Sequence, residues 1–198
     1  MTSRPKKTDD AKICEAALHL AATKGWHGVT VEAVAKAAKV SPPALKRRFS
    51  SPCDVIPLIV GHITQRSLAS VPGDVKNPRD ALFDAVMSRF DVLQENRKAI
   101  LAIARDARRD PALARVLAAS AIKGMGETLE AVGLNAPPES LRAAGLGAVY
   151  AWAFVVWSRD ESRDMAKTMA ALDKALRLGD RAVRLLTQAP SSEPRSGP

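Results

Sequence analysis

Apolar residues recur every three or four positions along most of this chain, with polar and charged residues between them. This spacing gathers apolar side chains on one face of a helix, whereas a half-buried strand needs strict alternation. Apolar β-branched runs long enough to build a sheet are few. The pattern therefore predicts an all-α fold of about nine helices.

Capping residues and breakers mark where these helices begin and end. Asp9 and Asp10 can cap the first helix, which ends before Gly25, and Ser41 can cap the third. The two prolines after Ser41 are tolerated in a first turn, where amide groups have no helical partner. The predicted helices cover residues 9–24, 30–38, 42–49, 54–69, 78–94, 97–106, 110–125, 139–157 and 162–186.

The chain has 198 residues, of which 46% are hydrophobic, enough for a small head and a larger body. We predict a head over residues 1–50, which opens with a flexible basic arm over residues 1–8. A helical body follows over residues 51–188. The Pro- and Ser-rich residues 189–198 are expected to be disordered.

Positive charge is concentrated in the head. The net charge is +9, and residues 1–50 hold ten Lys and Arg against four Asp and Glu, while the remainder holds twenty against seventeen. A basic module suits a polyanionic partner, because neutralising phosphates releases condensed counterions. A solvated basic surface is the alternative, and charge alone does not decide between the two.

Several classes of function find no support in the sequence. Cys14 and Cys53 have neither CxxC spacing nor neighbouring histidines, so we predict buried thiols and no metal site or disulfide. The three histidines lie far apart, and no Ser–His–Asp spacing or Gly-rich phosphate loop occurs. We therefore expect neither an enzyme nor a cofactor.

No segment is predicted to enter a membrane. The N-terminus lacks the apolar stretch of a signal peptide, and the most apolar run, Ala143 to Trp157, is too short to span a bilayer. A soluble, cytoplasmic protein with no membrane partner is the expectation.

The second and third predicted helices have the layout of a helix-turn-helix, in which the second helix of the pair enters the major groove of DNA. Val34, Leu45 and Phe49 can hold the module together, and Trp26 is expected to fill its core. Residues predicted to face or contact DNA are Thr30, Lys39, Ser41, Pro42, Ala44, Lys46, Arg47 and Arg48.

The stretch from Gly25 to Phe49, GWHGVTVEAVAKAAKVSPPALKRRF, resembles the signature of TetR-family transcriptional regulators, GxxxxTxxxIAxxAGVSxGxLYxHF. The resemblance implies a TetR-like fold, with a DNA-binding head and a C-terminal domain that binds an effector and pairs two subunits through its last two helices. It also implies a ligand-responsive repressor, which a small apolar effector releases from a double-stranded operator.

This chain departs from the signature at positions that matter for DNA contact. Lys39 stands where the family has a turn glycine, in a left-handed conformation that costs a lysine about 1 kcal/mol. Pro43 replaces a glycine, Lys46 a tyrosine and Arg48 a histidine or tyrosine, and Pro52 replaces a lysine that contacts phosphate. The three consecutive cations 46–48 can supply charge in place of the lost anchors.

An effector pocket is expected in the body, around the aromatic segment Tyr150 to Trp157. The candidate lining residues are Met87, Phe90, Ile103, Arg105, Tyr150, Trp152 and Phe154. Such sites are mostly apolar with a few polar groups, for which Arg105 and Tyr150 are the candidates. Packing in the core is the alternative for most of the apolar members.

A second hypothesis comes from a different class of protein. The segment Val149 to Ala182 loosely resembles the C-terminal helix pair of a ubiquinone-biosynthesis accessory protein, which has a TetR fold and binds lipids. On this alternative, the chain binds a lipid or isoprenoid and no longer binds DNA. The basic head could then face an anionic membrane.

Overall fold

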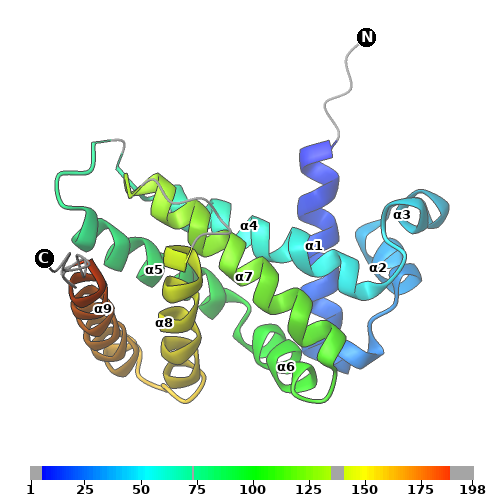
Figure 1. Ribbon diagram of the computed structural model, residues 1–198. Coiled ribbons are helices and arrows are strands. Elements are labelled where there is room, and N and C mark those ends of the chain that lie inside the picture. Colours follow the sequence, from blue (N-terminus) through cyan, green and yellow to red (C-terminus); the bar gives the residue numbers. More distant parts are fainter. Residues whose placement is uncertain (1–5, 73, 135–140, 188–198) are drawn as a thin grey trace, which may run out of the picture. The chain divides into compact units, whose positions relative to one another are not determined.

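A computed structural model describes residues 6–72, 74–134 and 141–187, and the long elements in those ranges are all α-helices (Figure 1). They are α1 (Lys6–Lys24), α2 (Val31–Ala38), α3 (Pro42–Arg48), α4 (Ile56–Leu68), α5 (Pro78–Glu95), α6 (Arg97–Ala107), α7 (Pro111–Ala131), α8 (Leu141–Trp157) and α9 (Ala166–Thr187). The predicted all-α fold of about nine helices is confirmed. The predicted disordered tail lies outside the described residues.

The chain divides into two compact units, residues 1–147 and residues 148–198. The first unit holds α1 to α7, and the second holds the larger part of α8 together with α9. The predicted boundary between head and body, at residue 50, therefore lies within the first unit.

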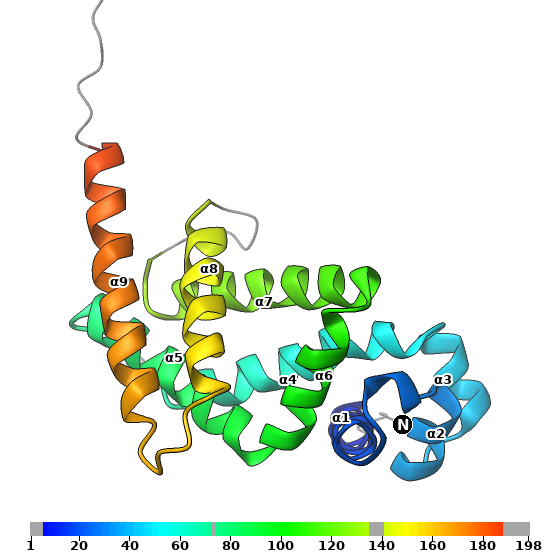
Figure 2. The same cartoon turned by 90° about the horizontal axis from the view of Figure 1, so that it is seen from below.

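In the first unit, α2 packs on α1 and α3 packs on α2, while α4 lies against both α5 and α7 (Figures 1 and 2). Val34 of α2, Phe90 of α5 and Leu113 of α7 have no exposed surface. Trp26, in a short 3-10 turn after α1, is 3% exposed and fills the core of the head as predicted. Burial of such side chains stabilises each by roughly 1.5–3 kcal/mol.

Two predicted helix starts in this unit are wrong. The first helix begins at Lys6 and includes part of the predicted arm, so Asp10 lies inside the helix, where it binds an arginine side chain and does not cap it. A 3-10 turn, Pro52–Val55, precedes α4, since the Asp54 carboxylate accepts a hydrogen bond from the Ser51 amide at 2.8 Å. Helix α7, predicted to run from residue 110 towards Met125, continues to Ala131, and Met125 and Leu129 in its last turns are buried.

In the second unit, α8 and α9 form an antiparallel pair (Figures 1 and 2). Helix α9 begins at Ala166 and not at the predicted Ser162. The reason is Asp160, whose carboxylate accepts hydrogen bonds from the amides of Ser162 and Thr168 at 3.1 and 2.9 Å. These bonds hold the intervening residues in a turn, in which Met165 has a φ of 52°.

None of the helices within the described residues combines the length and the apolar character needed to cross a membrane.

Candidate nucleic-acid interface

The turn between α2 and α3 is built from local hydrogen bonds. Thr30 caps α2, and its hydroxyl accepts a hydrogen bond from the Ala33 amide at 3.1 Å. Lys39 ends the helix with φ 56° and ψ 38°, which is the left-handed conformation predicted for this position. The Val40 amide then donates to the Ala35 carbonyl at 3.0 Å, so the chain reverses within two residues and α3 starts at once.

Helix α3 presents one buried face and one exposed face. Leu45 and the following Phe49 are 4% and 6% exposed and anchor the helix. The residues predicted to face DNA, Ser41, Pro42, Ala44, Lys46, Arg47 and Arg48, are all exposed, as are Thr30 and Lys39. Contact of these residues with DNA remains a prediction.

The N-terminus of α3 offers few hydrogen-bond donors. Proline has no amide hydrogen, so Pro42 and Pro43 remove two of the amides that a helix N-terminus normally presents to phosphate. Ala44 supplies the remaining amide of the first three positions. The Ser41 hydroxyl makes no capping hydrogen bond and can act as a further donor.

Two of the three cations of α3 already have acidic partners within the head. The Lys46 ammonium lies 2.5 Å from the Glu32 carboxylate of α2, and both side chains are more than half exposed. That hydrogen bond lowers the pKa of Glu32 below its usual value. Arg48 binds Asp10 of α1 through both terminal guanidinium nitrogens, Nη1 and Nη2, and its Nη2 lies 3.0 Å from Oδ2 of Asp10.

Arg48 has a second contact besides Asp10. Its guanidinium lies over the Phe49 ring, 4.8 Å from the centroid. The hydrogen bonds that Arg48 donates to Asp10 raise the pKa of Arg48, which stays charged. The guanidinium is therefore fixed by a carboxylate and by an aromatic face at once.

Arg47 and Lys39 differ from these two cations. Both are exposed, and neither has an acidic partner among the described residues. They are therefore available to phosphate without breaking an existing ion pair.

A buried carboxylate joins the head to the body within the first unit. Asp106 of α6 is 7% exposed and accepts hydrogen bonds from the amides of Trp26 and His27 at 2.7 and 3.3 Å. Burial acts to raise its pKa, but hydrogen bonds from Arg105 and from these amides outweigh burial and lower the pKa. Gly25 is required here, because its φ is 75° and a Cβ would lie 3.2 Å from the Asp106 carboxylate.

The sequence reasoning missed the roles of Asp10, Glu32 and Asp106. The sequence predicts Asp10 as a helix cap and predicts no contact for Glu32. Asp106 carried no signal at all, since its backbone partners lie about 80 residues earlier in the chain.

The predicted effector residues fall into both units. In the first, Phe90 and Ile103 are buried and Met87 is partly exposed, whereas Arg105 is 61% exposed at its side chain and pairs with Asp106. Arg105 thus lies at the junction with the head. In the second, the Tyr150 and Phe154 rings lie 6.3 Å apart, and Trp152 is 45% exposed.

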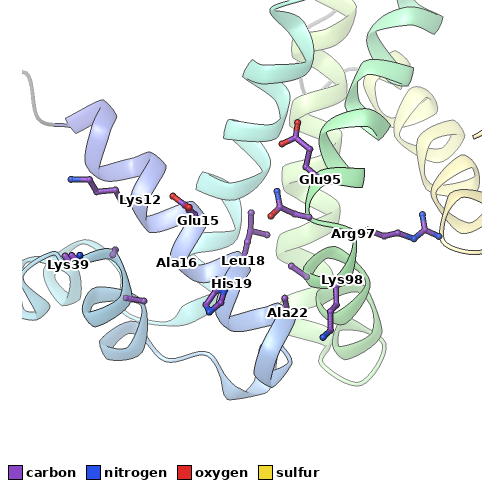
Figure 3. A pocket seen from close by; sticks show the side chains of 14 residues that line it. Lys12, Glu15, Ala16, Leu18, His19, Ala22, Lys39, Glu95, Arg97 and Lys98 are labelled. Atoms are coloured by element: carbon purple, nitrogen blue, oxygen red, sulfur yellow. The ribbon is translucent and has the colours of Figure 1, made fainter. Parts of the chain in front are cut away.

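A groove of about 600 Å³ lies in the first unit between α1, the end of α2 and the corner between α5 and α6 (Figure 3). Its charged and polar lining residues include Lys12, Glu15, His19, Lys39 and Lys98. None of the predicted effector residues lines it.

Comparison with known proteins gives a consistent result. Residues 13–51 match the family described as "Bacterial regulatory proteins, tetR family". The matched segment contains α2, α3 and most of α1. Among curated proteins, no match is found.

The fold is similar to that of solved regulators. A TetR transcriptional regulator from Nitrosomonas europaea is 19% identical, with a TM-score of 0.67 over 87% of this chain and 98% of that one. One from Rhodococcus is 18% identical, with a TM-score of 0.58 over 89% and 97%. The multidrug binding protein EbrR, solved with imidazole, is 22% identical, with a TM-score of 0.54 over 86% and 90%.

Proposed function

The chain is a TetR-family protein, and from this premise we propose that it regulates transcription by placing α3 in the major groove of an operator. Ser41, Pro42 and Ala44 then face the base edges, and Arg47 and Lys39 contact the phosphate backbone. Thr30 lies at the N-terminus of α2, whose amides point towards a second phosphate.

The observation that carries this proposal is the exposed face of α3. Its apolar anchors are buried in the head, so the helix is held firmly while its polar side remains open. Small residues at Pro42 and Ala44 let the backbone approach DNA closely, with Arg47 exposed and unpaired within the described part of the chain. Base reading on this face relies on few hydrogen bonds, because the residues near the start of α3 are short or lack an amide hydrogen.

A gel-shift experiment with the DNA upstream of the gene tests the proposal. We expect a shifted complex and a protected site with two-fold symmetry. Arg47→Ala should weaken binding by about tenfold, whereas Lys123→Ala, which removes an exposed cation from α7, should leave it unchanged. Absence of any shift at low salt would overturn the regulator proposal.

We further propose that a small apolar effector releases the protein from DNA. The support is the family and, within the first unit, the apolar side chains of Phe90, Ile103 and Met87 in the body. EbrR, with a similar fold, is described as binding multiple drugs. Arg105 is left out because it pairs with Asp106.

Thermal unfolding in the presence of a panel of apolar compounds tests this step. A true effector should raise the Tm, because it binds only the folded protein, and should dissociate the operator complex. Compounds that raise Tm without dissociating the complex would contradict the proposed release.

Homodimer formation through the last two helices is proposed as well. Ala148, Ala151, Trp152 and Val155 are exposed, apolar and lie on one side of α8, and unpartnered apolar stripes are typical of helix pairing between subunits. Val155→Asp should convert a dimer to a monomer in sedimentation experiments. Ala118→Asp, at an exposed alanine of α7, is the control. A monomeric wild-type protein would contradict the proposal.

A further inference from the structure

The Asp10–Arg48 pair connects the first turns of α1 to the last residue of α3. Both guanidinium nitrogens Nη1 and Nη2 donate to the carboxylate, one to each oxygen. The Asp10 side chain is 31% exposed and that of Arg48 is 44% exposed. The pair is therefore more sheltered than Lys46–Glu32, whose side chains are 57% and 56% exposed.

A carboxylate and a phosphate are equivalent partners for arginine. The planar guanidinium matches either group with two parallel hydrogen bonds. Asp10 thus occupies the donors that Arg48 would otherwise offer to a DNA phosphate. The same guanidinium also lies over the Phe49 ring, and Phe49 is itself buried.

We propose that Asp10 is a positioning residue: it keeps Arg48 from the DNA backbone and fixes the C-terminal end of α3 on α1. This inference rests on the proposed DNA-binding function. Arg48 then stabilises the packing of α3 on α1 within the head. Arg47 and Lys39 make the non-specific contacts with phosphate. An acidic residue would in this way restrain the attraction of a basic head for random DNA.

Asp10→Asn tests the proposal because it should release a cation. We expect tighter binding to a random duplex at low salt and a steeper dependence of log affinity on log salt concentration, by about 0.9 for one extra phosphate contact. Between 50 and 200 mM salt, the variant should lose about 3.5-fold more affinity than the wild type. The preference for operator over random DNA should fall, since α3 is less firmly placed.

Asp9→Asn is the matched control. It changes the net charge by the same amount one residue earlier, but among the residues that the structure describes Asp9 has only a distant ion pair with Lys12, at 3.9 Å. Its salt dependence should equal that of the wild type. Full-length proteins are compared by fluorescence anisotropy on one operator duplex and one random duplex.

The double variant Asp10→Asn with Arg48→Gln separates release of Arg48 from a loss of structure. It should return the salt dependence to the wild-type value, because the released cation is gone. If Asp10 were only structural, Asp10→Asn would lower Tm and weaken binding to both duplexes without a steeper salt dependence. That result would overturn the inference.

Failure of the inference can be told apart from failure of the proposed function. A wild-type protein that binds neither duplex at low salt would overturn both. A wild-type protein that binds its operator, with Asp10→Asn and Asp9→Asn showing equal salt dependence, would overturn only the role of Asp10.

Discussion

Asp10 in the head and Asp160 in the second unit are both aspartates that hold two segments together, but they do so with different chemistry. Asp10 is partly exposed and binds a cation, Arg48. Asp160 is 2% exposed and accepts hydrogen bonds from the amides and hydroxyls of Ser162 and Thr168. The Asp10 carboxylate competes with phosphate for the same guanidinium, whereas no group outside the fold competes for the donors around Asp160.

The difference shows where this protein can adapt to a partner and where it cannot. An ion pair as exposed as Lys46–Glu32 contributes about 0–1 kcal/mol, so a competing anion can replace Glu32 at little cost. Removing the hydrogen-bond donors of a buried carboxylate, or the carboxylate from its buried donors, lowers the free energy of unfolding by far more than the loss of an exposed ion pair. In the head, Lys46–Glu32 is of this exchangeable kind, whereas the hydrogen-bond networks of Asp106 and Asp160 are fixed.

The largest effect is expected at Asp160. Asp160→Ala leaves the buried donors of Thr168 and the amide of Ser162 without this acceptor, so the free energy of unfolding should fall by about 3 kcal/mol. Urea unfolding measures the change. Glu161→Ala removes the neighbouring exposed carboxylate and should have little effect; equal losses in the two variants would contradict the role of Asp160.

The Asp160 network also predicts a dependence of stability on pH. Burial acts to raise the pKa of Asp160, but the hydrogen bonds from Ser162 and Thr168 outweigh it and lower the pKa far below the usual value. The folded state thus binds this proton less readily than the unfolded state. Its stabilisation is complete above the unfolded pKa, about 3.9, and is lost as the pH falls through the lower folded pKa.

Urea unfolding as a function of pH checks this dependence. The stability difference between wild type and Asp160→Asn should shrink as the pH falls below about 4. A difference that stays constant down to the acid limit of folding would show that the charge of Asp160 is not the source of the stabilisation.

A smaller effect is expected at Asp106. Asp106→Asn keeps the shape of the side chain but weakens the hydrogen bonds from the Trp26 and His27 amides, so stability should fall by about 2 kcal/mol. Arg105→Ala should cost less, because that side chain is largely exposed. The fluorescence of Trp26 reports whether the head loosens; an unchanged melting curve for Asp106→Asn would contradict its role at the junction.

The smallest effect is expected at Glu32. Glu32→Gln releases Lys46, but a phosphate can already displace this exposed carboxylate in the wild-type protein. Affinity for a random duplex should rise by less than about threefold, and the salt dependence should change less than in Asp10→Asn. Glu130→Gln, in α7, is the control. A larger change than that of Asp10→Asn would reverse the proposed order of the two pairs.

Features that depend on near neighbours in the chain could be predicted from the sequence. The left-handed Lys39, the buried Leu45 and Phe49 and the core position of Trp26 follow from spacing and turn chemistry. These features rest on helical periodicity and capping, which act over three or four residues.

Partners that are far apart in the chain could not be predicted. Arg48 and Asp10 are 38 residues apart, and Asp106 bonds to amides about 80 residues away. The local sequence pattern does not indicate which acidic side chain will pair with a given Lys or Arg in the folded protein. The predicted start of α9 at Ser162 was also wrong, because Asp160 holds Ser162 in the turn that precedes the helix.

One measurement tests most directly which arginine contacts phosphate, Arg47 or Arg48. It is the salt dependence of DNA binding, compared between Arg47→Gln and the charge-neutral double variant Asp10→Asn with Arg48→Gln. The pair removes Arg48 without leaving Asp10 unpaired. Arg47→Gln should make the salt dependence shallower by about 0.9, while the double variant should match the wild type. A double variant as shallow as Arg47→Gln would show that Arg48 contacts phosphate and that Asp10 does not hold it away from DNA.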